Sequence, residues 1–235
     1  AAGLFCAFTA AQRGRRVLVL EKSNKVGKKI LMSGGGRCNF TNLYVDADNF
    51  VSANPHFCKS ALARYTQWDF IAMVERHQIE YEERNHGQLF CVHSSKDILA
   101  MLLRECELVG VQIEINAELG TIENLSTAEQ PGFQLEVLQT SKLTGSSSKL
   151  CCASLVVASG ALSVPTLGGS GKGYDIAAQF GLTLLPRRAG LAPLMFSDSI
   201  KAICNTLSGI SLEVEVSCQG QSFTGQLLFT HRGVS

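Results

Sequence analysis

A glycine-rich segment carries the residue types in this chain that are best suited to holding a ligand. Three consecutive glycines lack a Cβ, so the backbone can take positive φ there and lie against a large polar group. This segment, the glycine cradle, consists of Ser33, Gly34, Gly35, Gly36, Arg37, Cys38 and Asn39. A flexible linker is the alternative, but linkers do not alternate with large apolar residues as this segment does at Ile30, Leu31 and Phe40. The pattern indicates a polar binding loop anchored in a core.

The first residues of the chain have the pattern of the second half of a dinucleotide-binding βαβ unit. A helix of small residues is predicted up to Gly14, and the apolar run 17–20 is predicted to form a buried parallel strand. Glu21 follows this strand at the position that takes a ribose hydroxyl in such units. Gly3 would be the last glycine of a G-x-G-x-x-G turn, so Ala2 and Gly3 are candidates for contacting a dinucleotide.

Positive charge is concentrated around the same segments, although the net charge of the chain is only +1. Eight basic residues accompany a single acid between positions 13 and 37. They are Arg13, Arg15, Arg16, Lys22, Lys25, Lys28, Lys29 and Arg37. This excess leaves room for a second anionic ligand beside one dinucleotide, either a nicotinamide dinucleotide or a nucleic acid backbone. For the arginines at 13–16, a solvated face is an equally good explanation.

Together these segments resemble the BaiN/YhiN-like family of FAD-dependent oxidoreductases, also labelled aminoacetone oxidases. The resemblance runs in order over nearly all 235 residues and includes a turn at 158–160 and the closing segment 228–235. Its most specific part is the string 33–42. The family usually has Gly-Asp-Gly-Tyr where this chain has Gly-Lys-Gly-Tyr at 171–174, which replaces an acid with a base. The resemblance implies noncovalently bound FAD.

The resemblance also implies which residues bind the cofactor. Leu119 would present backbone groups to the adenine after a strand, and Ser159 and Gly160 would pass close to the flavin or the pyrophosphate. The cofactor-binding candidates are Ala2, Gly3, Glu21, Lys22, Lys29, Ser33, Gly34, Gly35, Gly36, Arg37, Cys38, Asn39, Leu119, Ser159 and Gly160.

Cys38 is the candidate catalytic residue, because the resemblance places the end of the cradle near the flavin ring. A thiol with a pKa of about 8.5 is mostly protonated at neutral pH and can supply a proton. The neighbouring Arg37 would lower that pKa and favour a thiolate. The alternative is a small residue that fits a tight turn, and the sequence leaves both roles open.

Other elements are predicted from periodicity and capping. Residues 54–76 have the apolar spacing of a helix, and Ser94 or Ser95 is predicted to cap a further helix. Residues 120–157 are expected to form a small β-meander. The apolar run 155–158 is expected to be a buried strand that leads into the turn at Ser159 and Gly160.

The expected fold class is α/β. A Rossmann-like FAD-binding domain with the β-meander would occupy 1–188, and an inserted antiparallel β domain that covers the substrate would begin at 189–235. The chain starts without Met and stops inside what looks like a motif. We therefore expect a fragment that lacks the first strand of the Rossmann sheet and the C-terminal part.

Composition excludes several classes of protein. The nine cysteines form no C-x-x-C pair and the five histidines no H-E-x-x-H motif, so neither a thioredoxin-like redox pair nor a metal site is predicted. Scattered free cysteines are typical of a reducing cytoplasm. No run of 18 apolar residues occurs, so no association with a membrane is expected.

The resemblance to this family implies an FAD-dependent oxidoreductase that reduces a carbon–carbon double bond of an organic substrate, with NAD(P)H as the expected donor. Steroid-like enones and the uracil ring of structured RNA are the candidate substrates. One alternative is an amine or aminoketone oxidase in which dioxygen reoxidises the flavin; another is a nonenzymatic flavin-binding or RNA-binding module. The sequence leaves the substrate and the oligomeric state open.

Overall fold

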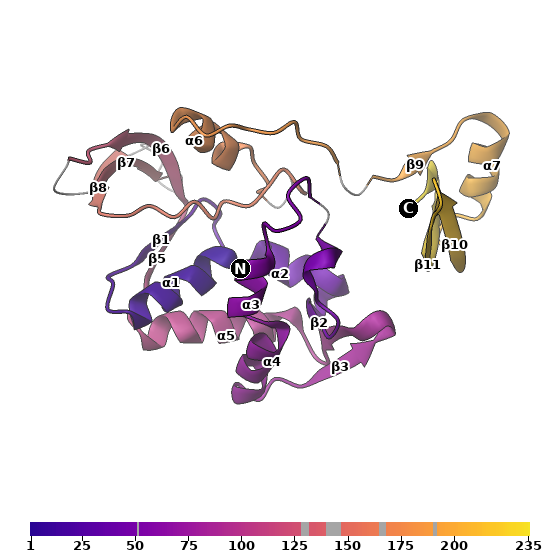
Figure 1. The fold of residues 1–235 in the computed structure, drawn as a ribbon, viewed down its shortest axis with the longest axis horizontal. Coiled ribbons are helices and arrows are strands. Elements are labelled where there is room, and N and C mark those ends of the chain that lie inside the picture. Colours follow the sequence, from indigo (N-terminus) through magenta and orange to yellow (C-terminus); the bar gives the residue numbers. More distant parts are fainter. Residues whose placement is uncertain (51, 128–131, 140–146, 165–167, 190–191) are drawn as a thin grey trace. The chain divides into compact units, whose positions relative to one another are not determined.

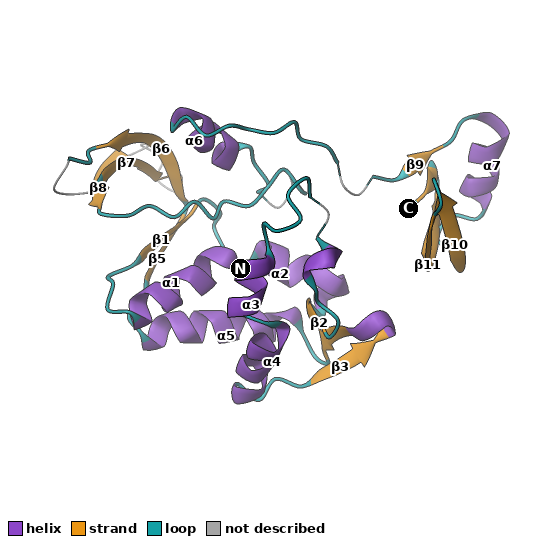
Figure 2. Cartoon of the chain, in the orientation of Figure 1, coloured by secondary structure: helices purple, strands orange, loops and turns teal. Residues whose placement is uncertain are grey.

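A computed structural model describes residues 1–50, 52–127, 132–139, 147–164, 168–189 and 192–235. The chain divides into two units, Ala1–Leu182 and Thr183–Ser235, a few residues before the boundary expected at 188. Figures 1 and 2 show the helices and strands of both units.

The first unit mixes helices with strands from three sheets. Its elements are α1 (Ala2–Gln12), β1 (Leu18–Glu21), α2 (Lys28–Met32), the 3-10 helix η1 (Ser33–Gly36), β2 (Asn39–Asn42), η2 (Ala47–Asn49), α3 (Lys59–Arg64), α4 (Gln67–Arg76), β3 (Tyr81–Arg84), η3 (Asn85–Gly87), β4 (Gln88–Cys91), α5 (Ser95–Leu108), β5 (Gln112–Ile115), β6 (Ala117–Asn124), β7 (Phe133–Gln139), β8 (Ser147–Cys152) and α6 (Lys172–Gln179).

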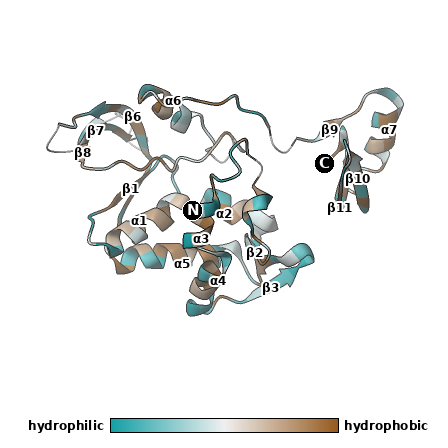
Figure 3. Cartoon of the chain, in the orientation of Figure 1, coloured by the Kyte–Doolittle hydropathy of each residue, from teal (hydrophilic) through white to brown (hydrophobic). Residues whose placement is uncertain are grey.

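The Rossmann-like part consists of β1 and β5, which pair in parallel with Leu18 opposite Gln112, and of α1 and α5, which precede them. The helices lie side by side in Figure 1. Figure 3 shows α1 as largely apolar, whereas α5 alternates apolar and polar residues. Both helices contribute to one core, whose members include Leu4, Phe8 and Met101. This arrangement confirms the predicted α/β fold class.

Local sequence sets where α5 begins. Ser94 caps the helix: its hydroxyl accepts a hydrogen bond from the Lys96 N–H at 3.1 Å, and the Asp97 carboxylate accepts one from the Ser94 N–H at 3.2 Å. The other predicted candidate, Ser95, is buried instead, and its hydroxyl donates to the Leu31 carbonyl at 3.0 Å. Ser95 thereby fixes α5 to the end of α2.

Two antiparallel sheets complete the first unit. One has the order β2-β4-β3, and its first strand begins at Asn39, the last residue of the glycine cradle. The other, β6-β7-β8, is the predicted meander. The expected strand at 155–158 does not form: the segment has no regular secondary structure, and Val156 and Val157 are 62% and 44% exposed. A strand needs a neighbour for its backbone hydrogen bonds, and none of the described strands pairs with this segment.

The second unit is mostly antiparallel sheet, as expected for residues after 189. Its elements are β9 (Leu194–Met195), α7 (Asp198–Thr206), β10 (Ser211–Cys218), β11 (Gln221–Thr230) and β12 (Gly233–Val234). The strand order is β10-β11-β12-β9. The long hairpin β10–β11 corresponds to the two alternating stretches in the sequence.

The structure describes the state of the cysteines, the groupings of metal-binding side chains and the character of the helices. All nine cysteines are free thiols. Among the described residues there is no group of three or more His, Cys, Asp or Glu side chains that could hold a metal ion. None of the described helices is long and apolar enough to cross a membrane.

A buried carboxylate makes the stability of the first unit depend on pH. Glu105 of α5 is 6% exposed, and its Oε1 lies 2.6 Å from His77 Nε2 and 3.1 Å from Arg76 Nη2. The hydrogen bond from His77, followed by those of Arg76, lowers the pKa of Glu105 against the opposing effect of burial. The folded chain therefore binds this proton less tightly than the unfolded chain does. The stabilisation is present above the ordinary pKa of 4.5 and is lost as the pH falls through the lowered value.

We expect Glu105→Gln to cost about 1.5 to 3 kcal/mol of unfolding free energy at neutral pH and much less in acid. Urea denaturation of both proteins at neutral pH and below the ordinary pKa of 4.5 measures this difference. Glu107→Gln is the control, because that carboxylate is exposed and pairs at the surface with Arg104 at 2.9 Å. A Glu105→Gln penalty that does not change with pH would contradict this account.

Candidate cofactor site

The start of α1 lies against the extended segment that follows the meander. A Cβ on Gly3 would lie 3.4 Å from the Ala158 Cβ, so a larger side chain at this position would separate the two segments. Lys29 of α2 reaches the same place: its Nζ donates to the Ser163 hydroxyl at 3.1 Å and lies 3.3 Å from where Gly160 would carry a Cβ. Residues from three distant parts of the sequence therefore meet at the N-terminal end of α1.

Glu21 lies beside this group at the end of β1. Its Oε1 accepts a hydrogen bond from the Ser23 N–H at 2.8 Å, which orients the carboxylate. Its Oε2 has no hydrogen-bond partner among the described residues. The charges of Glu21 and Lys29 both act on the amino group of Ala1, which places both side chains near the start of the helix. The carboxylate retains an oxygen that can accept a hydrogen bond from a ligand hydroxyl.

The three glycines of the cradle all have positive φ, with values of 57°, 64° and 89° for Gly34, Gly35 and Gly36. At Gly34 a Cβ would lie 2.7 Å from the Phe90 ring and 2.8 Å from the Asn39 nitrogen, so packing alone requires glycine there. At Gly35 and Gly36 a Cβ would meet no heavy atom within 4 Å. The cradle is therefore fixed to the fold on one side and has free space on the other, as a ligand-binding loop requires.

Backbone and side-chain hydrogen bonds hold the cradle in this shape. The Ser33 hydroxyl donates to the Ile30 carbonyl at 2.8 Å, and the Cys38 N–H donates to the Ser33 carbonyl at 3.0 Å. The Arg37 carbonyl accepts from the Cys91 N–H at 2.9 Å. Because Ser33 follows Lys29 by four residues, across the short helix α2, the cradle is continuous with the group at the start of α1.

Cys38 belongs to the main core and is 5% exposed. Burial raises the pKa of its thiol, and the hydrogen bond with Ser33 opposes this only in part. The lowering expected from Arg37 does not occur, because that guanidinium is half exposed and lies 3.4 Å from Glu82 Oε1. Cys91 lies close by in the same core, and burial together with Cys38 raises its pKa to about 12. Burial therefore favours the protonated form of the Cys38 thiol, and its role as a proton donor stays a prediction.

Two more of the predicted residues make contacts of their own. Lys22 is an exposed residue whose ammonium pairs with Glu118 at 2.6 Å, so this charge is engaged at the start of β6. Leu119 follows in β6, opposite Val137, and packs against the smaller core.

The first turn of α6 lies against the segment that contains Ser159 and Gly160. Ser159 Oγ lies 2.9 Å from where Gly173 would carry a Cβ, so the two segments touch. Lys172, which replaces the usual acid of the resembled family, donates to the Gly120 carbonyl at 3.1 Å. The substituted base therefore fastens α6 to a bulge in β6.

The structure thus brings Gly3, Glu21, Lys29 and Gly160 together and joins them to the cradle through α2. Sequence reasoning missed Ser163, the partner of Lys29, because no local motif marks it. It also missed Ser23, because the contact with Glu21 is made by the Ser23 backbone N–H and the residue type at this position gives no signal.

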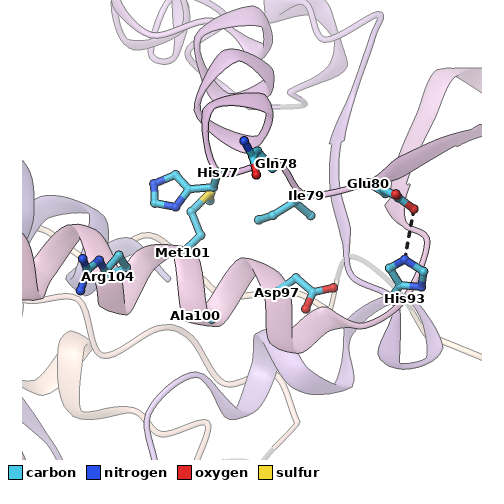
Figure 4. Close-up of a pocket in the computed structure, with 9 residues that line it drawn as sticks. All are labelled: His77, Gln78, Ile79, Glu80, His93, Asp97, Ala100, Met101 and Arg104. Carbon is cyan, nitrogen blue, oxygen red and sulfur yellow. Dashed lines mark hydrogen bonds and ion pairs between the residues drawn. The ribbon is translucent and has the colours of Figure 1, made fainter.

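A separate cavity of about 450 Å³ lies between the end of α4 and α5. Figure 4 shows it with His77, Gln78 and Arg104 at its edge and with His93 pointing to Glu80, 3.1 Å away. None of the predicted cofactor-binding residues lines it. The cavity carries charges of both signs and no residue group that selects one ligand.

Comparison with known proteins gives the site its context. A profile of the HI0933-like protein Rossmann domain matches residues 1–229. Two curated relatives, from Haemophilus influenzae and Escherichia coli, are each 47% identical over 236 residues that cover 100% of this chain, and both are named ribosomal RNA dihydrouridine synthase. A third, from Clostridium scindens, is named 3-dehydro-bile acid delta(4,6)-reductase and is 25% identical over 192 residues, 79% of this chain and 43% of the relative.

The chain covers 57% and 56% of the first two relatives, a little over half of their length. The profile, in contrast, extends across both units of the structure, from the βαβ half-unit and the cradle to the hairpin β10–β11. The chain therefore belongs to the HI0933-like Rossmann family, the BaiN/YhiN-like group of FAD-dependent oxidoreductases that its sequence resembles.

Proposed function

We propose that this protein is an FAD-dependent reductase that uses NAD(P)H to saturate a carbon–carbon double bond, with the uracil ring of structured RNA as its substrate. The observation that carries the cofactor assignment is the cradle, where Gly35 and Gly36 combine positive φ with free space. The relatives support the reaction type, since dihydrouridine is uridine with its ring double bond reduced, and the name of the bile acid relative also describes a reductase.

The residues present suit FAD. The start of α1, with Ala2 and Gly3, offers unpaired N–H groups and the positive end of a helix dipole to a pyrophosphate. Glu21 would accept from the adenosine ribose, and Lys29 adds a positive charge beside Gly160. Leu119 and Ser159 remain candidates for the backbone contacts on the adenine and flavin sides. Bound FAD supplies the hydride chemistry, and the chain binds and orients it.

The overall reaction balances with one proton. NAD(P)H provides a hydride equivalent, which ends on one carbon of the double bond, and a proton from a donor or from water ends on the other carbon. NAD(P)⁺ and the saturated ring are the products. The protein must therefore hold the double bond so that one carbon faces the hydride and the other faces the source of the proton.

Cys38 is the predicted proton donor, but its burial in the core favours a packing role. We therefore expect Cys38→Ala to leave both half-reactions within a few-fold of the unaltered protein in single-turnover experiments. Cys91→Ala, in the same core, is the matched control for packing. Slowing of flavin reoxidation by the unsaturated substrate on the order of 10²-fold, with normal flavin reduction and only in Cys38→Ala, would instead assign the acid role to Cys38.

Stopped-flow reduction under anaerobic conditions tests which compound donates electrons to the flavin. We expect NADH or NADPH to bleach the flavin absorbance within the turnover time, whereas amines and aminoketones leave it oxidised. The reverse pattern would establish the amine oxidase alternative and overturn the proposal.

The nine free thiols and a ribosomal RNA substrate both agree with a cytoplasmic location, which we propose as well.

A further inference from the structure

We propose that Arg13, Arg15 and Arg16 form a phosphate-binding patch that holds the RNA backbone at a distance from the cofactor site. The inference rests on the proposed function, because it assumes that the substrate is RNA. It concerns a different surface from the cradle, and its test measures RNA binding separately from catalysis.

The patch lies at the end of α1 that is remote from the cofactor site. The first turn of α1 meets Ala158, whereas Arg13 follows the last turn and the other two arginines lead into β1. An α-helix of 11 residues is about 16 Å long. Figure 1 shows the connection from α1 to β1 at the end of α1 away from α2. The three arginines therefore cannot serve the pyrophosphate at the start of α1.

The turn that carries the arginines is well defined. The N–H groups of Arg13 and Arg15 both donate to the Ala10 carbonyl, at 3.1 and 3.2 Å. Gly14 between them has a φ of 79°, and a Cβ there would meet no atom within 4 Å. The backbone is thus fixed, and the surface around it is open.

The three guanidinium groups are exposed and have no ion pair or side-chain hydrogen bond with any described residue. Other basic groups of the same block are engaged: Lys22 pairs with Glu118 and Arg37 with Glu82. Glu107, an exposed acid in the last turn of α5, is likewise paired with Arg104. The patch therefore retains its full positive charge.

This arrangement favours an extended polyanion over a small ligand. Guanidinium groups bind phosphate oxygens in a bidentate way, and the three arginines line neither of the two pockets found among the described residues. RNA-binding modules can follow a helix over about 16 base pairs, which is far more than the length of α1. One RNA can thus place a uridine at the cofactor site and its backbone on the arginines.

The test compares two triple variants of equal charge. Arg13→Gln/Arg15→Gln/Arg16→Gln removes the patch, and Arg64→Gln/Lys96→Gln/Lys149→Gln removes three exposed basic residues elsewhere in the same unit. The affinity for unmodified ribosomal RNA made by transcription is measured over a range of salt concentrations. We expect the patch variant to reduce the slope of log affinity against log salt by about 2 to 3, and the control variant to leave it unchanged.

FAD affinity and flavin reduction by NAD(P)H should be the same in all three proteins. An unchanged salt slope in the patch variant, or an equal loss in the control variant, would overturn the inference while leaving the proposed function intact. If the unaltered protein binds RNA through the patch but reduces no uridine, the inference stands and the proposed function fails. If it binds no RNA, both fail; binding of an acidic protein by the patch in that case would identify a different partner.

Discussion

Gly34→Ala is expected to lower the free energy of unfolding by about 2 to 5 kcal/mol and to abolish stable flavin binding. The residue has a φ of 57°, which costs an L side chain about 1 to 2 kcal/mol. Its Cβ would also lie 2.7 Å from the Phe90 ring and 2.8 Å from the Asn39 nitrogen. The backbone atom cannot move without breaking the start of β2, so the cradle itself must distort.

Gly36→Ala is the matched variant, because its Cβ would meet no atom within 4 Å. Only the backbone strain remains, so we expect a loss of about 1 to 2 kcal/mol. FAD affinity should nevertheless fall about tenfold or more, since the added methyl group would enter the free side of the cradle. Urea denaturation and FAD titration of both variants measure these effects. Equal stability losses would contradict the packing requirement at Gly34, and normal FAD affinity in Gly36→Ala would show that the cradle does not hold the cofactor.

Glu21→Ala is expected to weaken FAD binding about 10- to 150-fold, which corresponds to about 1.5 to 3 kcal/mol for a charged hydrogen bond. Turnover at saturating FAD should remain normal, because the carboxylate would hold the adenosine ribose, away from the reacting ring. Titration of the apoprotein with FAD gives the affinity. Glu114→Ala, an exposed acid on the neighbouring strand β5, is the control for the loss of one charge. Unchanged FAD affinity in Glu21→Ala would mean that the end of β1 is not the ribose site.

The parts of the fold that sequence predicts are those with local signals. The small-residue helix and apolar run at the start of the chain became α1 and β1, and Ser94 caps α5 as its spacing to Asp97 indicates. The expected helix at 54–76 is instead two helices, α3 and α4. Thr66 begins the second with a capping box to Asp69, a signal that apolar periodicity alone does not register.

The sheet β2-β4-β3 was not predicted, because its short strands carry little alternation of apolar and polar residues. Glu82, Glu83 and Arg84 give β3 a polar sequence that is typical of a loop. Strand pairing here depends on the hairpin turn at His86, which has a φ of 62°, and on burial of Leu89 and Cys91 in β4. Such long-range packing has no signature within β3 itself.

The candidate site also has a part that local sequence predicts and a part that depends on contacts between distant residues. The cradle was predicted because three adjacent glycines are a local signal for positive φ, which all three show. The contacts of Lys29 with Ser163 and of Gly3 with Ala158 join residues more than 130 positions apart, so only the folded chain reveals them. The burial of Cys38 was also hidden, because its φ of 51° and its place beside Cys91 depend on the sheet that sequence did not predict.

The most direct test of the account is the fate of the electrons in the reduced flavin. The purified protein is reduced with one equivalent of NAD(P)H without oxygen and mixed with unmodified ribosomal RNA, and the flavin band at about 450 nm is followed. The account predicts that the band returns with the formation of one dihydrouridine per flavin, and that RNA in which the uridines are already reduced has no effect. A flavin that stays reduced in the presence of RNA and is reoxidised only by dioxygen would contradict it.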